Sequence, residues 1–132
     1  LRRSLTLLPR EGPRLRALAG VLLEHLRDRI PDVRFNSCFE AGIPGLVSLS
    51  FEGLDGQALV AELNFLGFAC STGAACQEQK KEPARAILAL GRSPSEALGT
   101  LRISMGRETS AADVDELART LVEVVVRQRA LA

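Results

Sequence analysis

Hydrophobic residues in the first quarter of the chain are spaced as in an amphipathic helix. They recur at intervals of three and four: Leu15, Leu18, Ala19, Leu22 and Leu26. Residues at these intervals share one face of an α-helix, and proline suits the first helical position. The spacing therefore predicts a helix that begins at Pro13 and ends near Pro31.

Two later segments alternate apolar and polar residues, a period typical of half-buried β-strands. They span residues 46–51 and 100–105. The residues predicted to face the core are Val47, Leu49, Phe51, Leu101, Ile103 and Met105. The same alternation places Arg102 and Ser104 on the opposite face. A short apolar run at 68–70 favours a third strand.

Capping residues mark three further helices. Asp55 suits the N-cap of a helix that ends at Gly67, because glycine tolerates the left-handed conformation that often follows a helix. A compact helix follows Pro83 and stops at Gly91. Residues 110–113 resemble a capping box, and the apolar spacing beyond them predicts a last helix of about four turns.

Helices and strands thus alternate along the chain in the order α-β-α-β-α-β-α. This order predicts an α/β or α+β fold in which helices cover a small sheet, while the pattern alone leaves the strand directions open. A length of 132 residues is usual for one domain. We therefore expect a single domain over residues 1–132 with one hydrophobic core.

Composition narrows the classes of partner. The 17 lysines and arginines nearly balance 16 acidic residues, so no global field attracts nucleic acid or an anionic membrane. The N-terminal arginines lack interleaved aromatic residues, which favours a solvated helix face over a nucleic-acid arm. They are Arg2, Arg3, Arg10, Arg14 and Arg16. No stretch approaches the roughly 20 apolar residues that span a bilayer, and the apolar start is too short for an export signal.

Cysteine is the first candidate for chemistry. Cys38, Cys70 and Cys76 form no CxxC pair, and their odd number favours a reducing compartment, so we expect a cytoplasmic protein. Cys76 follows the small residues 73–75 and precedes the polar pair 77–78, which predicts a solvent-accessible nucleophile on a loop. The alternative for a single cysteine is a small buried hydrophobe. Cys70 adjoins the short apolar run, and we expect it in the core.

Arg102 and His25 are further candidates. A guanidinium on the outer face of a strand can hold a carboxylate through two hydrogen bonds, and a surface salt bridge is the alternative. His25 lies far in sequence from every cysteine. We therefore expect a structural or surface histidine and no metal site.

Two segments resemble the motifs of one family. Residues 68–76, Phe-Ala-Cys-Ser-Thr-Gly-Ala-Ala-Cys, resemble the active-site cysteine segment of cysteine desulfurases, and residues 101–109 resemble their substrate-arginine strand. Between them, residues 82–91 are similar to the connecting helix, and residues 45–63 resemble the segment before the cysteine. The likeness covers residues 14–125, and it identifies the chain as similar to the C-terminal small domain of these class V aminotransferase-like enzymes.

The resemblance implies a fold, a reaction and partners. The fold is the small, mostly antiparallel sheet covered by helices that fold-type I pyridoxal-phosphate enzymes carry at their C-terminus. Cys76 takes sulfur from L-cysteine as a persulfide and leaves alanine, while Arg102 holds the substrate α-carboxylate. The persulfide passes to an iron–sulfur scaffold or another sulfur acceptor, and the intact enzyme is expected to be a homodimer. Selenocysteine is a further possible substrate, because the fragment does not distinguish sulfur from selenium.

The resemblance also implies a missing part. The family's cofactor lysine, its ring-stacking histidine and its ring-nitrogen aspartate belong to a large domain upstream. Lys80 and Lys81 are the chain's only lysines, and they lie in the polar run 77–82, a poor setting for a Schiff-base lysine. Ala74 stands where the family usually has serine. We expect pyridoxal phosphate in the intact enzyme, and neither cofactor nor desulfurase activity on this chain alone. A non-enzymatic persulfide carrier and an inert truncation are the alternatives.

Overall fold

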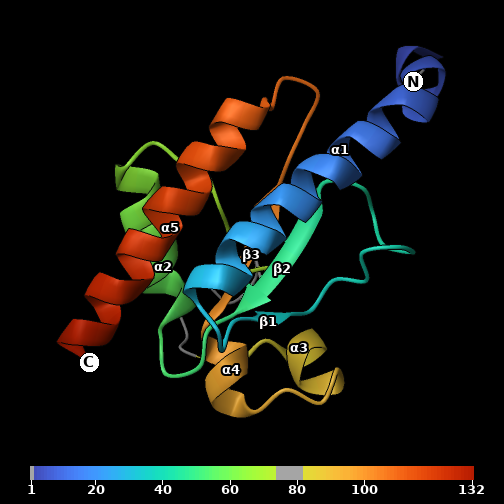
Figure 1. The fold of residues 1–132 in the computed structure, drawn as a ribbon. Coiled ribbons are helices and arrows are strands. Elements are labelled where there is room, and N and C mark those ends of the chain that lie inside the picture. Colours follow the sequence, from blue (N-terminus) through green and yellow to red (C-terminus); the bar gives the residue numbers. More distant parts are fainter. Residues whose placement is uncertain (1, 74–81) are drawn as a thin grey trace.

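The fold is a three-stranded sheet with its main helices on one side (Figure 1). The computed structural model describes residues 2–73 and 82–132. Its elements are α1 (Arg2–Arg29), β1 (Arg34–Phe35), β2 (Leu46–Ser50), α2 (Gly56–Phe65), α3 (Arg85–Ala89), α4 (Pro94–Leu98), β3 (Thr100–Ser104) and α5 (Ala111–Leu131).

The sheet has the order β1-β2-β3, and both pairings are antiparallel. β2 and β3 pair along their full length, from Leu46 opposite Ser104 to Ser50 opposite Thr100. The alternation predicted for the two longer strands is confirmed, because Val47, Leu49, Phe51, Leu101 and Ile103 are buried. The predicted class, a small antiparallel sheet covered by helices, is therefore confirmed.

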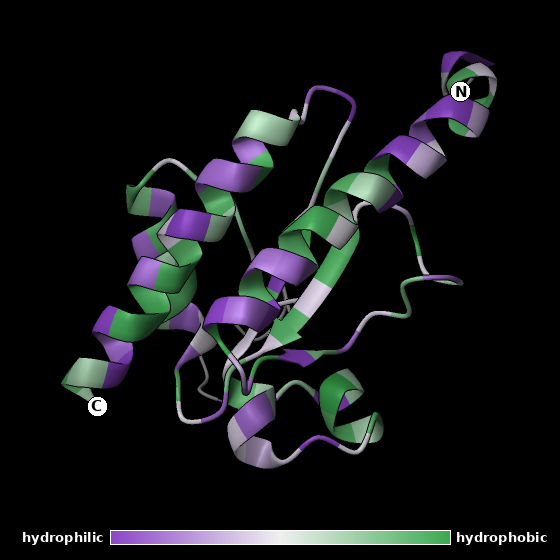
Figure 2. Cartoon of the chain, in the orientation of Figure 1, coloured by the Kyte–Doolittle hydropathy of each residue, from purple (hydrophilic) through white to green (hydrophobic). Residues whose placement is uncertain are grey.

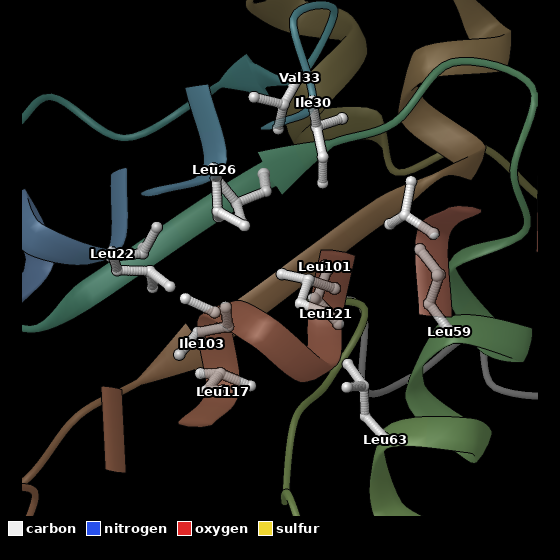
Figure 3. Close-up of a cluster of buried hydrophobic side chains, with 14 of the residues drawn as sticks. Leu22, Leu26, Ile30, Val33, Leu59, Leu63, Leu101, Ile103, Leu117 and Leu121 are labelled. Carbon is white, nitrogen blue, oxygen red and sulfur yellow. The ribbon is translucent and has the colours of Figure 1, made fainter. Parts of the chain in front are cut away.

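The hydrophobic core lies between the sheet and α1, α2 and α5 (Figure 3). Its largest fully buried side chains come from all of these elements: Leu22, Leu26, Ile30, Leu49, Phe51, Leu59, Leu63, Leu101 and Leu121. Each such side chain contributes about 1.5–3 kcal/mol by leaving water. Figure 2 shows hydrophilic and hydrophobic residues interleaved along α1 and α5, as expected of helices with one buried face.

The first helix is longer than its apolar spacing predicts. α1 begins at Arg2 instead of Pro13 and contains both Pro9 and Pro13. Proline lacks an N–H and so removes one hydrogen bond of the helix ladder. Because the two prolines are four residues apart and exposed, both missing bonds fall on one solvent-facing side, where water can satisfy the freed carbonyls. The predicted end near Pro31 is confirmed.

Three short elements depart from the predicted order. β1 spans two residues and α4 spans five, too few for a hydrophobic period to reveal. The strand predicted at 68–70 is wrong, since only an isolated bridge at Ser71 forms. The last helix extends beyond four turns to Leu131, where ion pairs from Arg127 to Glu62 and from Arg129 to Asp32 hold it against other elements.

Candidate functional site

Arg102 lies in the middle of β3 with its side chain exposed on the face away from the core, as predicted. Two serines oppose it across the sheet: Ser48 on β2, and Ser71 through the isolated bridge. Ser71 N–H donates to the Arg102 carbonyl at 3.1 Å, and Arg102 N–H donates to the Ser71 carbonyl at 2.6 Å. Both backbone hydrogen bonds of Arg102 are therefore made with Ser71, and Arg102 faces Ser48 as a pair without backbone hydrogen bonds between them.

Cys76, the predicted nucleophile, lies outside the described residues. It follows Ser71 by five positions in the sequence. The Ser71 bridge therefore brings the beginning of the predicted cysteine segment against Arg102, which is 31 residues further along the chain. The two sequence motifs meet at one edge of the sheet.

The guanidinium of Arg102 has no hydrogen-bond or ion-pair partner anywhere in residues 2–73 and 82–132. The sequence left two interpretations of Arg102, a binding site for a substrate carboxylate and a surface salt bridge. The salt bridge needs an acidic side chain beside the guanidinium, and the described part of the chain supplies none. An arginine in this state presents its planar set of N–H donors to solvent. The geometry therefore suits an incoming anion that accepts two hydrogen bonds, such as a carboxylate.

A buried polar network occupies the same sheet face beside Arg102. Ser50 and Thr100, opposite one another and almost fully buried, place their hydroxyl oxygens 3.0 Å apart. The Thr100 hydroxyl also donates to the Glu96 carbonyl at 3.3 Å, and Ser50 accepts from the Asn36 amide at 2.7 Å. The directions of these bonds follow: Asn36 donates to Ser50, Ser50 to Thr100, and Thr100 to Glu96. Every member of the network is thus satisfied.

Arg92 fixes the orientation of the Asn36 amide. Its Nε donates to Asn36 Oδ1 at 3.0 Å, and its NH2 group donates to the Phe35 carbonyl at 3.0 Å. The reverse orientation would place the amide N–H₂ against the guanidinium, donor against donor. The Asn36 nitrogen must therefore point toward the sheet, where it lies 2.7 Å from Ser50 Oγ and 3.4 Å from Ser48 Oγ.

Two arginines of α1 hold the loops that flank the site. Arg14 donates to the carbonyls of Gly106, Arg107 and Thr109, in the loop directly after β3. A hydrogen bond from Arg14 lowers the pKa of the Glu11 carboxyl, and the same contact raises the pKa of the arginine. Arg16 donates to the Phe39 and Gly42 carbonyls. Arg2, Arg3 and Arg10 are exposed, in agreement with the predicted solvated helix face. Arg14 and Arg16 are partly exposed and in addition bind loop carbonyls.

The two cysteines among the described residues, Cys38 and Cys70, differ in burial. Cys70 is partly buried against the core, in agreement with the sequence prediction, and desolvation raises the pKa of its thiol to about 11. Cys38 is exposed. His25 is a surface residue, with its Nδ1 atom 4.0 Å from an Asp115 carboxylate oxygen. Within the described ranges, no three histidine, cysteine or acidic side chains gather as metal ligands would.

The described residues do not fit pyridoxal phosphate as a resident group. A lysine must hold this cofactor as a Schiff base, and residues 2–73 and 82–132 contain none. Lys80 and Lys81 lie outside the described part of the chain. The residues in view therefore provide a binding surface for an anion, and no attachment point for the cofactor.

Sequence reasoning missed Ser48, Asn36 and Arg92. The hydroxyls at 48 and 50 on the polar face of the strand 46–51 were a signal, because that face would carry them beside Arg102 if the two strands paired. Asn36 and Arg92 gave no signal, since their contacts join segments 56 residues apart.

Comparison with known proteins identifies the family of the chain. A family model described as Aminotransferase class-V matches residues 13–117, which is most of the chain. The chain belongs to the aminotransferase class-V family. The matched region of this class-V chain runs from α1 into α5 and includes Arg14, Ser48 and Arg102.

Curated relatives carry the name that the sequence motifs suggest. The cysteine desulfurase IscS of Clostridium botulinum is 30% identical over 127 residues, covering 95% of this chain and 32% of the relative. The IscS-like cysteine desulfurase of Mycobacterium tuberculosis is 34% identical over 126 residues, with the same two coverages. The resemblance to cysteine desulfurases is confirmed, and the class-V chain spans about a third of the length of these relatives.

Solved structures support the fold. A NifS-like protein superposes with a TM-score of 0.78 at 19% identity, over 94% of this chain and 30% of its own. A sugar aminotransferase from Streptococcus pneumoniae, itself described as putative, gives 0.66 at 16% identity, over 96% and 34%. The class-V chain therefore has the fold of about a third of each of these two structures. Among the described helices, none has the length and hydrophobicity to cross a membrane.

Proposed function

We propose that this class-V chain is the small domain of a cysteine desulfurase and that it supplies two residues to the reaction. Arg102 binds the substrate α-carboxylate, and Cys76 accepts the sulfur. The observation that carries the proposal is the backbone bridge between Ser71 and Arg102, which joins the substrate-binding strand to the segment that leads to Cys76.

Arg102 suits its role because its guanidinium is exposed and has no described partner to displace. A bidentate contact fixes both the position and the orientation of a carboxylate. The strand that carries Arg102 pairs with β2 on one side and with Ser71 on the other. The backbone from which the guanidinium extends is therefore fixed in place. A carboxylate held in this way fixes the position of the remaining substrate atoms relative to the protein.

Cys76 takes the sulfur of L-cysteine. The thiol of Cys76 and the thiol of the substrate form a new S–S bond, while the substrate Cβ–S bond breaks and Cβ gains a proton. The products are a Cys76 persulfide and alanine, so atoms and electrons balance without a further oxidant. Cys76 reacts as the thiolate, the nucleophilic form of cysteine.

The proposal requires other protein parts. Pyridoxal phosphate is held by a large domain that carries the lysine, and residues 1–132 form the single small domain beside it. The intact protein is a cytoplasmic homodimer that passes sulfur to an iron–sulfur scaffold or another acceptor protein. Support comes from the relatives, whose length is about three times that of this chain.

Mass spectrometry tests the proposal on the chain assembled with a lysine-bearing, pyridoxal-phosphate-binding domain. After incubation with L-cysteine, the peptide that contains Cys76 is expected to gain the mass of one sulfur atom, and alanine is expected in equal amount. Cys76→Ser should abolish both products, whereas Cys38→Ser, a matched change at an exposed cysteine, should leave both unchanged.

Three results would contradict the proposal. Loading of Cys76 by an independent sulfur donor, without the cofactor domain or L-cysteine turnover, would establish a persulfide carrier instead. Sulfur found on Cys38 in place of Cys76 would overturn the assignment of the nucleophile. Full turnover by Arg102→Ala would overturn the role of the arginine.

A further inference from the structure

The Ser48 hydroxyl differs from its neighbours in how its hydrogen is used. Ser50 and Thr100 each accept one hydrogen bond and donate one inside the buried network. Ser48 Oγ accepts from Asn36 Nδ2 at 3.4 Å, and its own hydrogen has no acceptor among residues 2–73 and 82–132. Ser48 therefore keeps one donor available.

The direction of the surrounding hydrogen bonds explains why this donor is available. Arg92 occupies the Asn36 carbonyl oxygen and so turns the amide nitrogen toward the sheet. An amide nitrogen carries two hydrogens, so one serves Ser50 and the other points to Ser48. Because the Ser48 hydroxyl accepts a hydrogen bond from Asn36, its own hydrogen points away from Asn36.

The strand register places this donor beside Arg102. Ser48 and Arg102 are directly opposite across β2 and β3, and Ser48 is half-buried while Arg102 is exposed on the same face. Directly opposed residues have Cβ atoms about 4.5–5.5 Å apart. The hydroxyl thus lies at the base of the arginine side chain, on the face where a bound anion would sit.

We propose that the Ser48 hydroxyl donates a hydrogen bond to the same substrate carboxylate that Arg102 binds. Asn36 and Arg92 act as positioning residues that keep this hydroxyl in its donor orientation. A carboxylate has about four acceptor sites, so a bidentate guanidinium leaves room for a further donor. This inference rests on the proposed function, because it assigns two donors to one carboxylate.

Steady-state kinetics of the chain assembled with its cofactor-binding domain test the inference. Ser48→Ala is expected to raise the KM for L-cysteine about tenfold, a usual effect of losing one hydrogen bond to a charged group, with a smaller change in kcat. Ser48→Thr keeps the hydroxyl and should restore most of the affinity. Asn36→Ala should raise KM in the same direction by a smaller factor.

Ser104→Ala is the matched control, because Ser104 is exposed on the same face of β3 and lies opposite Leu46. Its KM should equal that of the unsubstituted protein. Thermal unfolding of each variant separates loss of affinity from loss of structure.

The possible results are distinct. If Ser48→Ala keeps the unsubstituted KM while Arg102→Ala loses activity, the inference is overturned and the proposed function stands. If Ser48→Thr behaves as Ser48→Ala at unchanged thermal stability, the hydroxyl is not the cause, and the inference is again overturned. If the unsubstituted assembly does not turn over L-cysteine, the proposed function itself fails, and the inference fails with it.

Discussion

At the scale of single residues, burial decides which thiols can react. The Cys70 side chain is partly buried against the core, and desolvation raises the pKa of its thiol to about 11 because the charged thiolate is disfavoured away from water. A thiol with this pKa is about one part in a thousand thiolate at pH 8. Cys70 therefore behaves as a structural side chain, although it lies only six positions before Cys76.

Alkylation kinetics should separate Cys70 from Cys38. We expect iodoacetamide at about pH 8 to modify the exposed Cys38 at least tenfold faster than Cys70, because the alkylating agent reacts with accessible thiolate. Peptide mass spectrometry over time measures both rates. In denaturant the two rates should become similar. Equal rates in the folded protein would show that burial does not protect Cys70.

Residue-scale predictions from the sequence succeeded where one strand's alternation decided the outcome. Arg102 was predicted on the outer face because Leu101 and Ile103 alternate with it, and the structure confirms that side. The partnership with Ser48 needs the register between β2 and β3, which no local pattern contains. The role of Cys76 stays a prediction.

At the scale of elements, the start of α5 shows how a local signal fixes a boundary. The capping box predicted at 110–113 is confirmed: Ser110 accepts from the Asp113 N–H, and the Asp113 carboxylate accepts from Ser110. These hydrogen bonds lower the pKa of the Asp113 carboxyl. The bonds favour the ionised form, so their stabilising effect is present at neutral pH and is lost as the pH falls through the lowered pKa.

Ser110→Ala should destabilise the protein by about 1 kcal/mol at neutral pH, the usual effect of losing a serine N-cap. Urea unfolding monitored by circular dichroism measures the change. The difference from the unsubstituted protein should shrink partly in acid, because a neutral Asp113 carboxyl accepts more weakly from the Ser110 hydroxyl than the carboxylate does. Ser104→Ala removes an exposed serine outside any cap and should change stability by less than about 0.5 kcal/mol. A penalty for Ser110→Ala that is constant from neutral to acidic pH would contradict the assigned role of the Asp113 charge.

Element boundaries without such signals were not predictable from the sequence. α1 continues through Pro9 and Pro13, which local rules treat as stop or start positions. The run 68–70 has the composition of a strand, yet only Ser71 pairs with β3. Whether the helix or strand forms depends in each case on the exposure of the segment to solvent or on its pairing with a distant strand. Hydrophobic periodicity carries information on neither.

At the scale of the whole molecule, the proposed function divides substrate binding and cofactor binding between this chain and a separate domain. The described sheet carries the exposed Arg102 and the Ser48 hydroxyl, whose hydrogen has no acceptor among the described residues, and residues 2–73 and 82–132 include no lysine for a Schiff base. This division agrees with a chain that spans about a third of the length of its cysteine desulfurase relatives.

We expect the chain alone, mixed with pyridoxal phosphate and L-cysteine, to release no sulfide above a protein-free control. A sulfide assay measures this, and addition of the cofactor-binding domain should restore release. Lys80→Ala together with Lys81→Ala tests whether any cofactor absorbance on the isolated chain comes from these two lysines. Sulfide release by the isolated chain would contradict the proposed division of tasks.

The bridge at Ser71 also limits how far Cys76 can lie from the sheet. Five residues of extended chain span at most about 18 Å, and Cys76 is the fifth residue after Ser71. Under the proposed function, the Cα atom of the persulfide-carrying Cys76 therefore stays within about 18 Å of the Cα atom of Ser71. Any acceptor thiol has to reach Cys76 within that region while the bridge holds. Under the proposed function, the two hydrogen bonds between Ser71 and Arg102 thus limit how far from the sheet an acceptor protein can bind.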